Sequence, residues 1–112
     1  MSGITTHVLD TARGRPAAGI AVSLAWQTGD GWTELASGRT DADGRVADLL
    51  PARVQDAAGT YRLRFDVGAY FAAQGAAPLF PYVDVVFDIR DAGRYHVPLL
   101  VSPFGYTTYR GS

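Results

Sequence analysis

The sequence predicts an all-β fold: an antiparallel β-sandwich of seven to eight strands with one short helix. Thirteen glycines and six prolines interrupt the 112 residues at short intervals. The stretches between them mostly alternate apolar and polar residues, which is the pattern of half-buried strands. Turn signals recur about every 8–12 residues, a spacing typical of sandwiches. The length suits one domain, so residues 1–112 are expected to fold together.

The first half of the chain is expected to supply three strands and two turns. Ile4 to Leu9 is a short strand candidate that ends at an aspartate. The clearest strand runs from Ile20 to Gln27, where every second side chain is a large apolar one. A turn at residues 28–31 leads into the returning strand, Trp32 to Arg39, and the two strands form a hairpin. A second turn follows at residues 40–45.

The second half is expected to supply one helix and four strands. Val67 to Gln74 has apolar side chains at helical spacing, and Gly75 is a stop signal. Pro98 lies inside one strand candidate. Because proline lacks a main-chain N–H, this strand is predicted to lie at a sheet edge or to carry a bulge. The strand candidates are Tyr61 to Val67, Tyr82 to Ile89, Tyr95 to Ser102 and Tyr106 to Tyr109.

The composition excludes several classes of protein. There is no cysteine, which rules out disulfide frameworks, zinc ribbons, iron–sulfur clusters and thiol catalysis. All ten basic side chains are arginines, so Schiff-base chemistry and Walker-type phosphate binding, which need lysine, are excluded as well. A net charge of −1 without a basic run argues against a nucleic-acid partner. The apolar stretches are too short for a membrane span, and the amino-terminal residues do not resemble a secretory signal, so we expect a cytoplasmic protein.

The two histidines, His7 and His96, are the first candidates for chemistry. The ordinary pKa of histidine, about 6.5, suits proton transfer near neutral pH. The structural alternative stays open, because a single histidine on a half-buried strand is more often a packing residue. A zinc site would need a third ligand at a suitable spacing, and the sequence offers none, so no metal is expected. No cofactor is expected either, since no cofactor motif is present.

Two further features are candidates for binding. Arg45 follows a turn and could hold a planar anion or polarise a carbonyl through paired donors, although a solvated turn arginine is the alternative. Asp41 and Asp43 look like part of a calcium loop, but the later ligands are missing and turn chemistry explains both. The last residues, 102–112, are rich in hydroxyl and aromatic side chains and are predicted to be ordered. The absence of a nucleophile elbow argues against a serine hydrolase.

Several stretches, in the same order along the chain, resemble the 5-hydroxyisourate hydrolases, the transthyretin-related enzymes of urate breakdown. The ending, Tyr109 to Ser112, is the most specific part, because transthyretins that carry hormone lack it. The sequence departs from the family at Arg94, where a histidine is frequent, and at Thr107, where a serine is frequent. The similar stretches are residues 5–10, 14–17, 40–45, 79–81 and 95–112.

The resemblance implies a transthyretin-like β-sandwich that assembles as a homotetramer. It further implies that the active sites lie in the channel between paired dimers, at the dimer–dimer interface. The implied site residues are, for catalysis, His7, Arg45, His96 and Ser112 and, for substrate binding, His7, Arg45, Tyr109, Arg110 and Gly111.

The implied reaction is hydrolysis of 5-hydroxyisourate to 2-oxo-4-hydroxy-4-carboxy-5-ureidoimidazoline in purine catabolism. Water would attack the ring acyl carbon, with His7 and His96 as an acid–base pair and Arg45 polarising the substrate. Which histidine is the base stays open. The alternative function is a non-catalytic, transthyretin-like module that binds a small ligand, which would need neither the paired histidines nor the special carboxyl-terminal residues.

Overall fold

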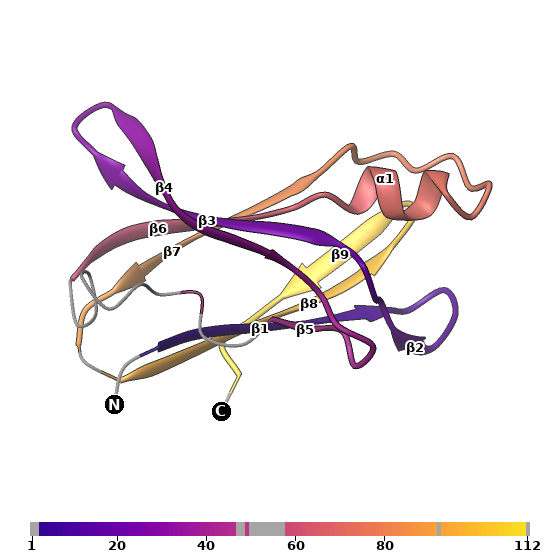
Figure 1. Ribbon diagram of the computed structural model, residues 1–112, viewed down its shortest axis with the longest axis horizontal. Coiled ribbons are helices and arrows are strands. Elements are labelled where there is room, and N and C mark those ends of the chain that lie inside the picture. The colour runs from indigo at the N-terminus through magenta and orange to yellow at the C-terminus, as the bar shows by residue number, and fades with distance from the viewer. Residues whose placement is uncertain (1–2, 47–48, 50–57, 92, 112) are drawn as a thin grey trace.

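The computed structural model describes residues 3–46, 49, 58–91 and 93–111, which form a β-sandwich of two sheets with one short helix (Figure 1). The predicted fold class is therefore confirmed. Seven of the nine strands have four or more residues, and the other two are two-residue strands. The elements are β1 (Gly3–Asp10), β2 (Arg15–Pro16), β3 (Ala21–Thr28), β4 (Gly31–Arg39), β5 (Arg45–Val46), β6 (Gly59–Phe65), α1 (Val67–Ala72), β7 (Val83–Ile89), β8 (Arg94–Ser102) and β9 (Gly105–Thr108).

The two sheets differ in one respect from the fully antiparallel arrangement that the sequence predicts. One sheet has the order β4-β3-β6-β7, and all its pairs are antiparallel. The other has the order β2-β1-β8-β9, with β5 also paired to β1, and in it β1 and β8 are parallel. No tight turn joins β1 to β8, because the chain passes through the other sheet between them. Such a long crossover permits the parallel direction.

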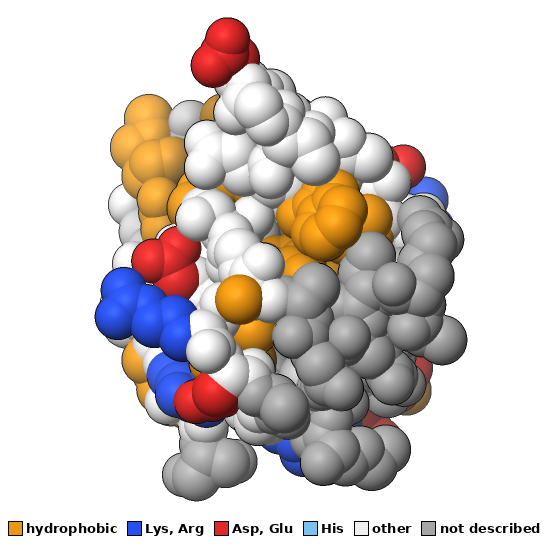
Figure 2. Space-filling model, turned by 90° about the vertical axis from the view of Figure 1, so that its left-hand side faces the viewer, with side chains coloured by type: hydrophobic (Ala, Val, Ile, Leu, Met, Phe, Trp, Pro, Cys, Tyr) orange, Lys and Arg blue, Asp and Glu red, His pale blue; other side chains and the backbone are white. Residues whose placement is uncertain are grey.

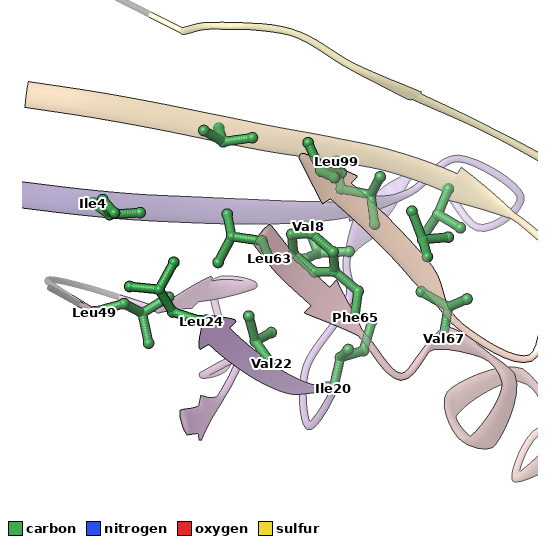
Figure 3. Packing of buried hydrophobic residues seen from close by; sticks show 14 of the residues in the cluster. Ile4, Val8, Ile20, Val22, Leu24, Leu49, Leu63, Phe65, Val67 and Leu99 are labelled. Carbon is green, nitrogen blue, oxygen red and sulfur yellow. The ribbon is translucent and has the colours of Figure 1, made fainter. Parts of the chain in front are cut away.

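The core lies between the facing sides of the two sheets (Figure 3). Ile4 and Val8 of β1 and Leu99 of β8 point toward Leu24 and Leu63 of the other sheet, and all five are fully buried. Burying each such side chain contributes about 1.5–3 kcal/mol to stability. Since side chains alternate along a strand, the intervening residues of β1 and β8 lie on the outer face of their sheet. That outer face holds the candidate site.

The helix starts where it is predicted, at Val67, but ends at Ala72 instead of Gln74. The Gln74 N–H donates to the carbonyl of Phe71 at 3.0 Å, which is the spacing of a tighter 3₁₀-type turn. Gly75 then takes a φ of +78°, which turns the chain out of the helix. The stop signal is therefore confirmed, and the tightened last turn explains the shorter helix.

Pro98 does not lie on an edge strand, because β8 is paired on both sides, to β1 and to β9. The edge alternative is therefore wrong. The pairing of β9 with β8 ends at Leu99, and the Thr108 hydroxyl donates to the Pro98 carbonyl at 2.8 Å. The nitrogen of Pro98 points to the same side of the strand as its carbonyl, toward the place where β9 ends. The missing donor falls in a gap of the ladder, which is why a proline fits inside this strand.

The surface at one end of the molecule carries charges of both signs. Figure 2 shows blue basic side chains beside red acidic ones on this face, with hydrophobic side chains between them. Among the described residues, no helix has the length and the apolar character needed to cross a bilayer.

Candidate active site

Strand pairing brings three of the predicted site residues onto one outer face. His7 on β1 lies directly opposite Arg45 on β5, and Thr5, two residues earlier on β1, lies opposite His96 on β8. Residues two apart on a strand share a face, and directly paired residues share it as well. The structure therefore places His7, Arg45 and His96 side by side, although each comes from a different strand.

A hollow of about 410 Å³ opens on this face, and its lining includes Thr5, Arg45, Arg94, His96 and Gly111. His7 lies beside this hollow and is not among its lining residues. A larger hollow of about 570 Å³ lies on the outer face of the opposite sheet and is lined by residues of β3, β4 and β6 with their neighbours, without a histidine. We place the candidate site in the smaller hollow, since that one combines an imidazole with two guanidinium groups.

Arg45 owes its position to the turn before it. The Asp41 carboxylate accepts the main-chain N–H groups of Asp43 at 2.9 Å and Arg45 at 3.0 Å, and these contacts, chiefly the one with Arg45, hold the pKa of Asp41 below its ordinary value. Gly44 has a φ of +76°, and a Cβ on it would collide with the Val8 carbonyl oxygen. The turn can therefore lie flat against β1 only with glycine at this position, and Asp41 performs the turn chemistry that the sequence predicts.

The imidazole of His96 is half-buried and has one hydrogen-bond partner among the described residues. Its Nδ1 lies 2.8 Å from the Thr5 hydroxyl. Burial lowers the pKa of His96, and the neighbouring His7 and Arg45 lower it further, while a main-chain contact with Thr5 opposes them. Because all the stronger effects disfavour the charged form, the surroundings of His96 favour the neutral imidazole. A neutral imidazole can accept a proton from water.

The carboxyl-terminal tail reaches the same imidazole. The Gly111 N–H donates to the His96 carbonyl at 2.7 Å, and the two residues form an isolated β-bridge. A Cβ on Gly111 would lie 2.5 Å from His96 Cδ2, closer than real carbon atoms approach. Gly111 therefore lets the tail pass directly against the ring. Ser112, the remaining predicted catalytic residue, lies outside the described residues.

Tyr109 and Arg110 do not share the hollow of His96. Both line a separate hollow of about 560 Å³ between β7 and the β8–β9 pair. The Arg110 guanidinium lies 4.1 Å from the centre of the Tyr95 ring and donates to the Arg94 carbonyl at 3.2 Å. These contacts tie the tail to β8 just before Gly111. In this structure Arg110 thus anchors the tail and is not among the residues that line the hollow of His96.

Thr5 and Arg94 were not predicted as lining residues. Alternation along the first strand already puts Thr5 on the face of His7, but its contact with His96 depends on the parallel register of β1 and β8. Nothing in the local sequence reveals that register. Arg94 was noted only as a departure from the resembled family. Across the part of the chain that the structure describes, no three His, Cys, Asp or Glu side chains gather as metal ligands would.

Comparison with known sequences identifies relatives over nearly the whole chain. A family model described as the HIUase/Transthyretin family matches residues 4–111. A 5-hydroxyisourate hydrolase of Deinococcus radiodurans is 49% identical over 114 residues, which cover 98% of this chain and 96% of the relative. A 5-hydroxyisourate hydrolase of Mus musculus is 46% identical over 115 residues, covering 99% and 96% of the two chains.

Solved structures of two kinds of protein have a similar fold. The 5-hydroxyisourate hydrolase of Klebsiella pneumoniae superposes with a TM-score of 0.87 at 37% identity, covering 98% of this chain and 99% of the other. A transthyretin of Sparus aurata superposes with a TM-score of 0.90 at 38% identity, covering 97% and 96%. Since a hydrolase and a transthyretin both match this well, the fold alone does not separate catalysis from ligand binding, and the site residues must do so.

Proposed function

Because this chain belongs to the HIUase/Transthyretin family, we propose that it is a hydrolase that converts 5-hydroxyisourate to 2-oxo-4-hydroxy-4-carboxy-5-ureidoimidazoline in urate breakdown. The observation that supports this proposal most is the grouping of His7, Arg45 and His96 on one sheet face, with Gly111 packed against His96. A proton acceptor, a second imidazole and a guanidinium can together activate water, protonate a leaving nitrogen and stabilise an oxyanion, which are the three tasks in hydrolysis of a cyclic amide.

The reaction begins when water attacks the acyl carbon of the six-membered ring. One histidine takes a proton from the water as its oxygen bonds to carbon, a step typically worth about 10²–10⁴-fold in rate. Negative charge then develops on the carbonyl oxygen, and Arg45 stabilises it through its paired N–H donors. The bond between the acyl carbon and the ring nitrogen breaks, and the second histidine supplies the proton that this nitrogen takes up.

The tail contributes by closing the site around His96. Ser112 follows Gly111 directly in the sequence, so we propose that its hydroxyl helps to order water or an imidazole. Tyr109 and Arg110 line the neighbouring hollow. We therefore assign Arg110 the role of fixing the tail, and Tyr109 a contact with substrate in the assembled protein. Substrate binding by Arg110 in the assembled protein stays a prediction.

We further propose a homotetramer with its sites at the dimer–dimer interface. β7 and β9 each form the edge of a sheet, and exposed edges favour symmetric pairing with a second copy. Leu79 and Phe104 are 65% and 72% exposed, so assembly would remove large apolar side chains from water. Light scattering tests this proposal: a tetramer supports it, and a fully active monomer contradicts it.

The test of the activity is incubation of the purified chain with freshly generated 5-hydroxyisourate, followed by ultraviolet absorbance against the spontaneous decay. We expect faster loss of substrate, unchanged by a metal chelator. A rate equal to that of buffer, from folded protein, would contradict the proposal. That result would favour the second candidate, a small-ligand binding module, which the similarity to transthyretins supports, one of them solved in complex with thyroxine.

A further inference from the structure

Two neighbours hold the imidazole of His96 from opposite edges. On one edge, the Thr5 hydroxyl lies 2.8 Å from Nδ1. On the other edge, Gly111 packs so closely that an added Cβ would lie 2.5 Å from Cδ2 and 3.3 Å from Cγ. Threonine is branched at Cβ and stiff at χ1, so its hydroxyl is a well-fixed partner. The ring is therefore held in one orientation.

This orientation leaves Nε2 as the ring nitrogen available for chemistry. The ring is bonded by Thr5 at Nδ1, and no described residue hydrogen-bonds Nε2. His96 and Thr5 both line the hollow in which substrate is proposed to bind. A neutral imidazole carries one proton, and the partner of one nitrogen decides whether the other nitrogen is a donor or an acceptor.

We propose that Thr5 is a positioning residue: its oxygen accepts a hydrogen bond from Nδ1–H of His96, which leaves the Nε2 lone pair as the general base. His7 then supplies the proton to the leaving ring nitrogen. This assignment rests on the proposed hydrolase function and deepens it, because it decides which histidine is the base. Thr5 itself touches no reacting atom and acts through His96.

The surroundings of His96 agree with this protonation state. The main-chain contact with Thr5 raises the pKa of His96. This contact is separate from the Thr5 hydroxyl, and Thr5→Val would leave it in place. The charged groups around the ring are His7 on β1, Arg45 on β5 and Arg94 two residues earlier on β8. Of these, His7 and Arg45 lower the pKa of His96 and so favour the neutral imidazole. A neutral imidazole near pH 7 is in the form that accepts a proton.

The experiment compares Thr5→Val with Thr5→Ser in the full-length chain. Valine keeps the shape and suits a strand but removes the hydroxyl, whereas serine keeps the hydroxyl. Nitrogen-15 NMR of the histidine rings reports which nitrogen carries the proton. The chain has only two histidines, so the spectrum holds two imidazoles, and His7→Gln assigns them. The same samples give kcat/KM against pH.

We expect the wild type and Thr5→Ser to carry the proton on Nδ1 of His96, with similar kcat/KM. In Thr5→Val, kcat/KM should fall about tenfold, the effect of losing one ordinary hydrogen bond that positions the base. The acid limb of the kcat/KM profile of Thr5→Val should move to lower pH, because this variant lacks the hydroxyl oxygen that stabilises the protonated ring of His96. If Thr5 only supported the fold, Thr5→Val with an unchanged thermal midpoint would keep the acid limb of the wild-type pH profile.

Two results would overturn the inference. One is a wild-type ring protonated at Nε2, and the other is a Thr5→Val variant with unchanged tautomer, pH profile and kcat/KM. The NMR measurement does not depend on turnover, so it tests the contact between Thr5 and His96 independently of the proposed hydrolase activity. A wild type protonated at Nδ1 but inactive on 5-hydroxyisourate would refute the hydrolase and the base assignment, while the Thr5 contact would stand.

Discussion

Replacing Gly111 by alanine is the sharpest perturbation of the proposed site. The new Cβ would lie 2.5 Å from His96 Cδ2 and 3.4 Å from Pro98 Cγ. Carbon atoms pack at about 3.5–4.0 Å, so the tail or the imidazole must move by about 1 Å. A displacement of this size in a catalytic group can lower the rate about 10²-fold. The φ of Gly111 is not in the left-handed region, so the effect arises from collision and not from backbone strain.

We expect Gly111→Ala to lower kcat on 5-hydroxyisourate about 100-fold. The free energy of unfolding should change by less than about 0.5 kcal/mol, since the tail adds little to the core. The assay follows loss of substrate absorbance, and urea unfolding is measured on the same preparation. Gly31→Ala is the matched control, because nothing lies within 4 Å of its added Cβ and its φ is ordinary. Wild-type turnover in Gly111→Ala would refute the reasoning that the tail packs on a catalytic imidazole.

Further predictions concern proton transfer, the tail and stability. His96→Asn should lose turnover by about 10²-fold or more and keep its thermal midpoint; loss of stability with an unchanged rate per folded molecule would make His96 a packing residue. In the wild type, kcat/KM should fall on the acid side with an apparent pKa below the ordinary 6.5. As pH falls, His96 is protonated in the unfolded chain before it is protonated in the folded chain, so the free energy of unfolding should also decline below about pH 6.5. An acid limb with an apparent pKa above 6.5 would contradict both expectations. Removal of Tyr109 to Ser112 should abolish activity in a folded protein, and an active truncated chain would show that the tail is dispensable. Tyr70→Phe removes the hydroxyl that donates to the fully buried Asp10 carboxylate at 2.8 Å. It should lower the free energy of unfolding by about 1–3 kcal/mol in urea titration without changing kcat; equal stability would mean that Asp10 finds another partner.

The sequence predicts most strands because alternation and turn residues are local signals. The hairpin of β3 and β4 and its turn follow from residues 20–39 alone. The parallel pairing of β1 with β8 does not, because no local signal determines which distant strands become neighbours. For the same reason Pro98 was placed wrongly: its tolerance depends on where β9 ends.

The candidate site shows the same division between local and distant information. His7, Arg45 and His96 are ordinary residues one by one, and only the resemblance to a family groups them before the structure is known. Pairing across three strands then explains how they meet. The contact of Thr5 with His96 could not be predicted, because it joins residues that are 91 positions apart.

The central claim is that His7 and His96 act together on one substrate molecule. A double-mutant cycle of His7→Asn, His96→Asn and the combined variant, measured as kcat/KM on 5-hydroxyisourate, tests it most directly. Groups that act as a unit are strongly non-additive, so we predict that the double variant is hardly slower than the slower single variant. Multiplicative losses, with the double variant slower by the product of both single effects, would contradict the claim.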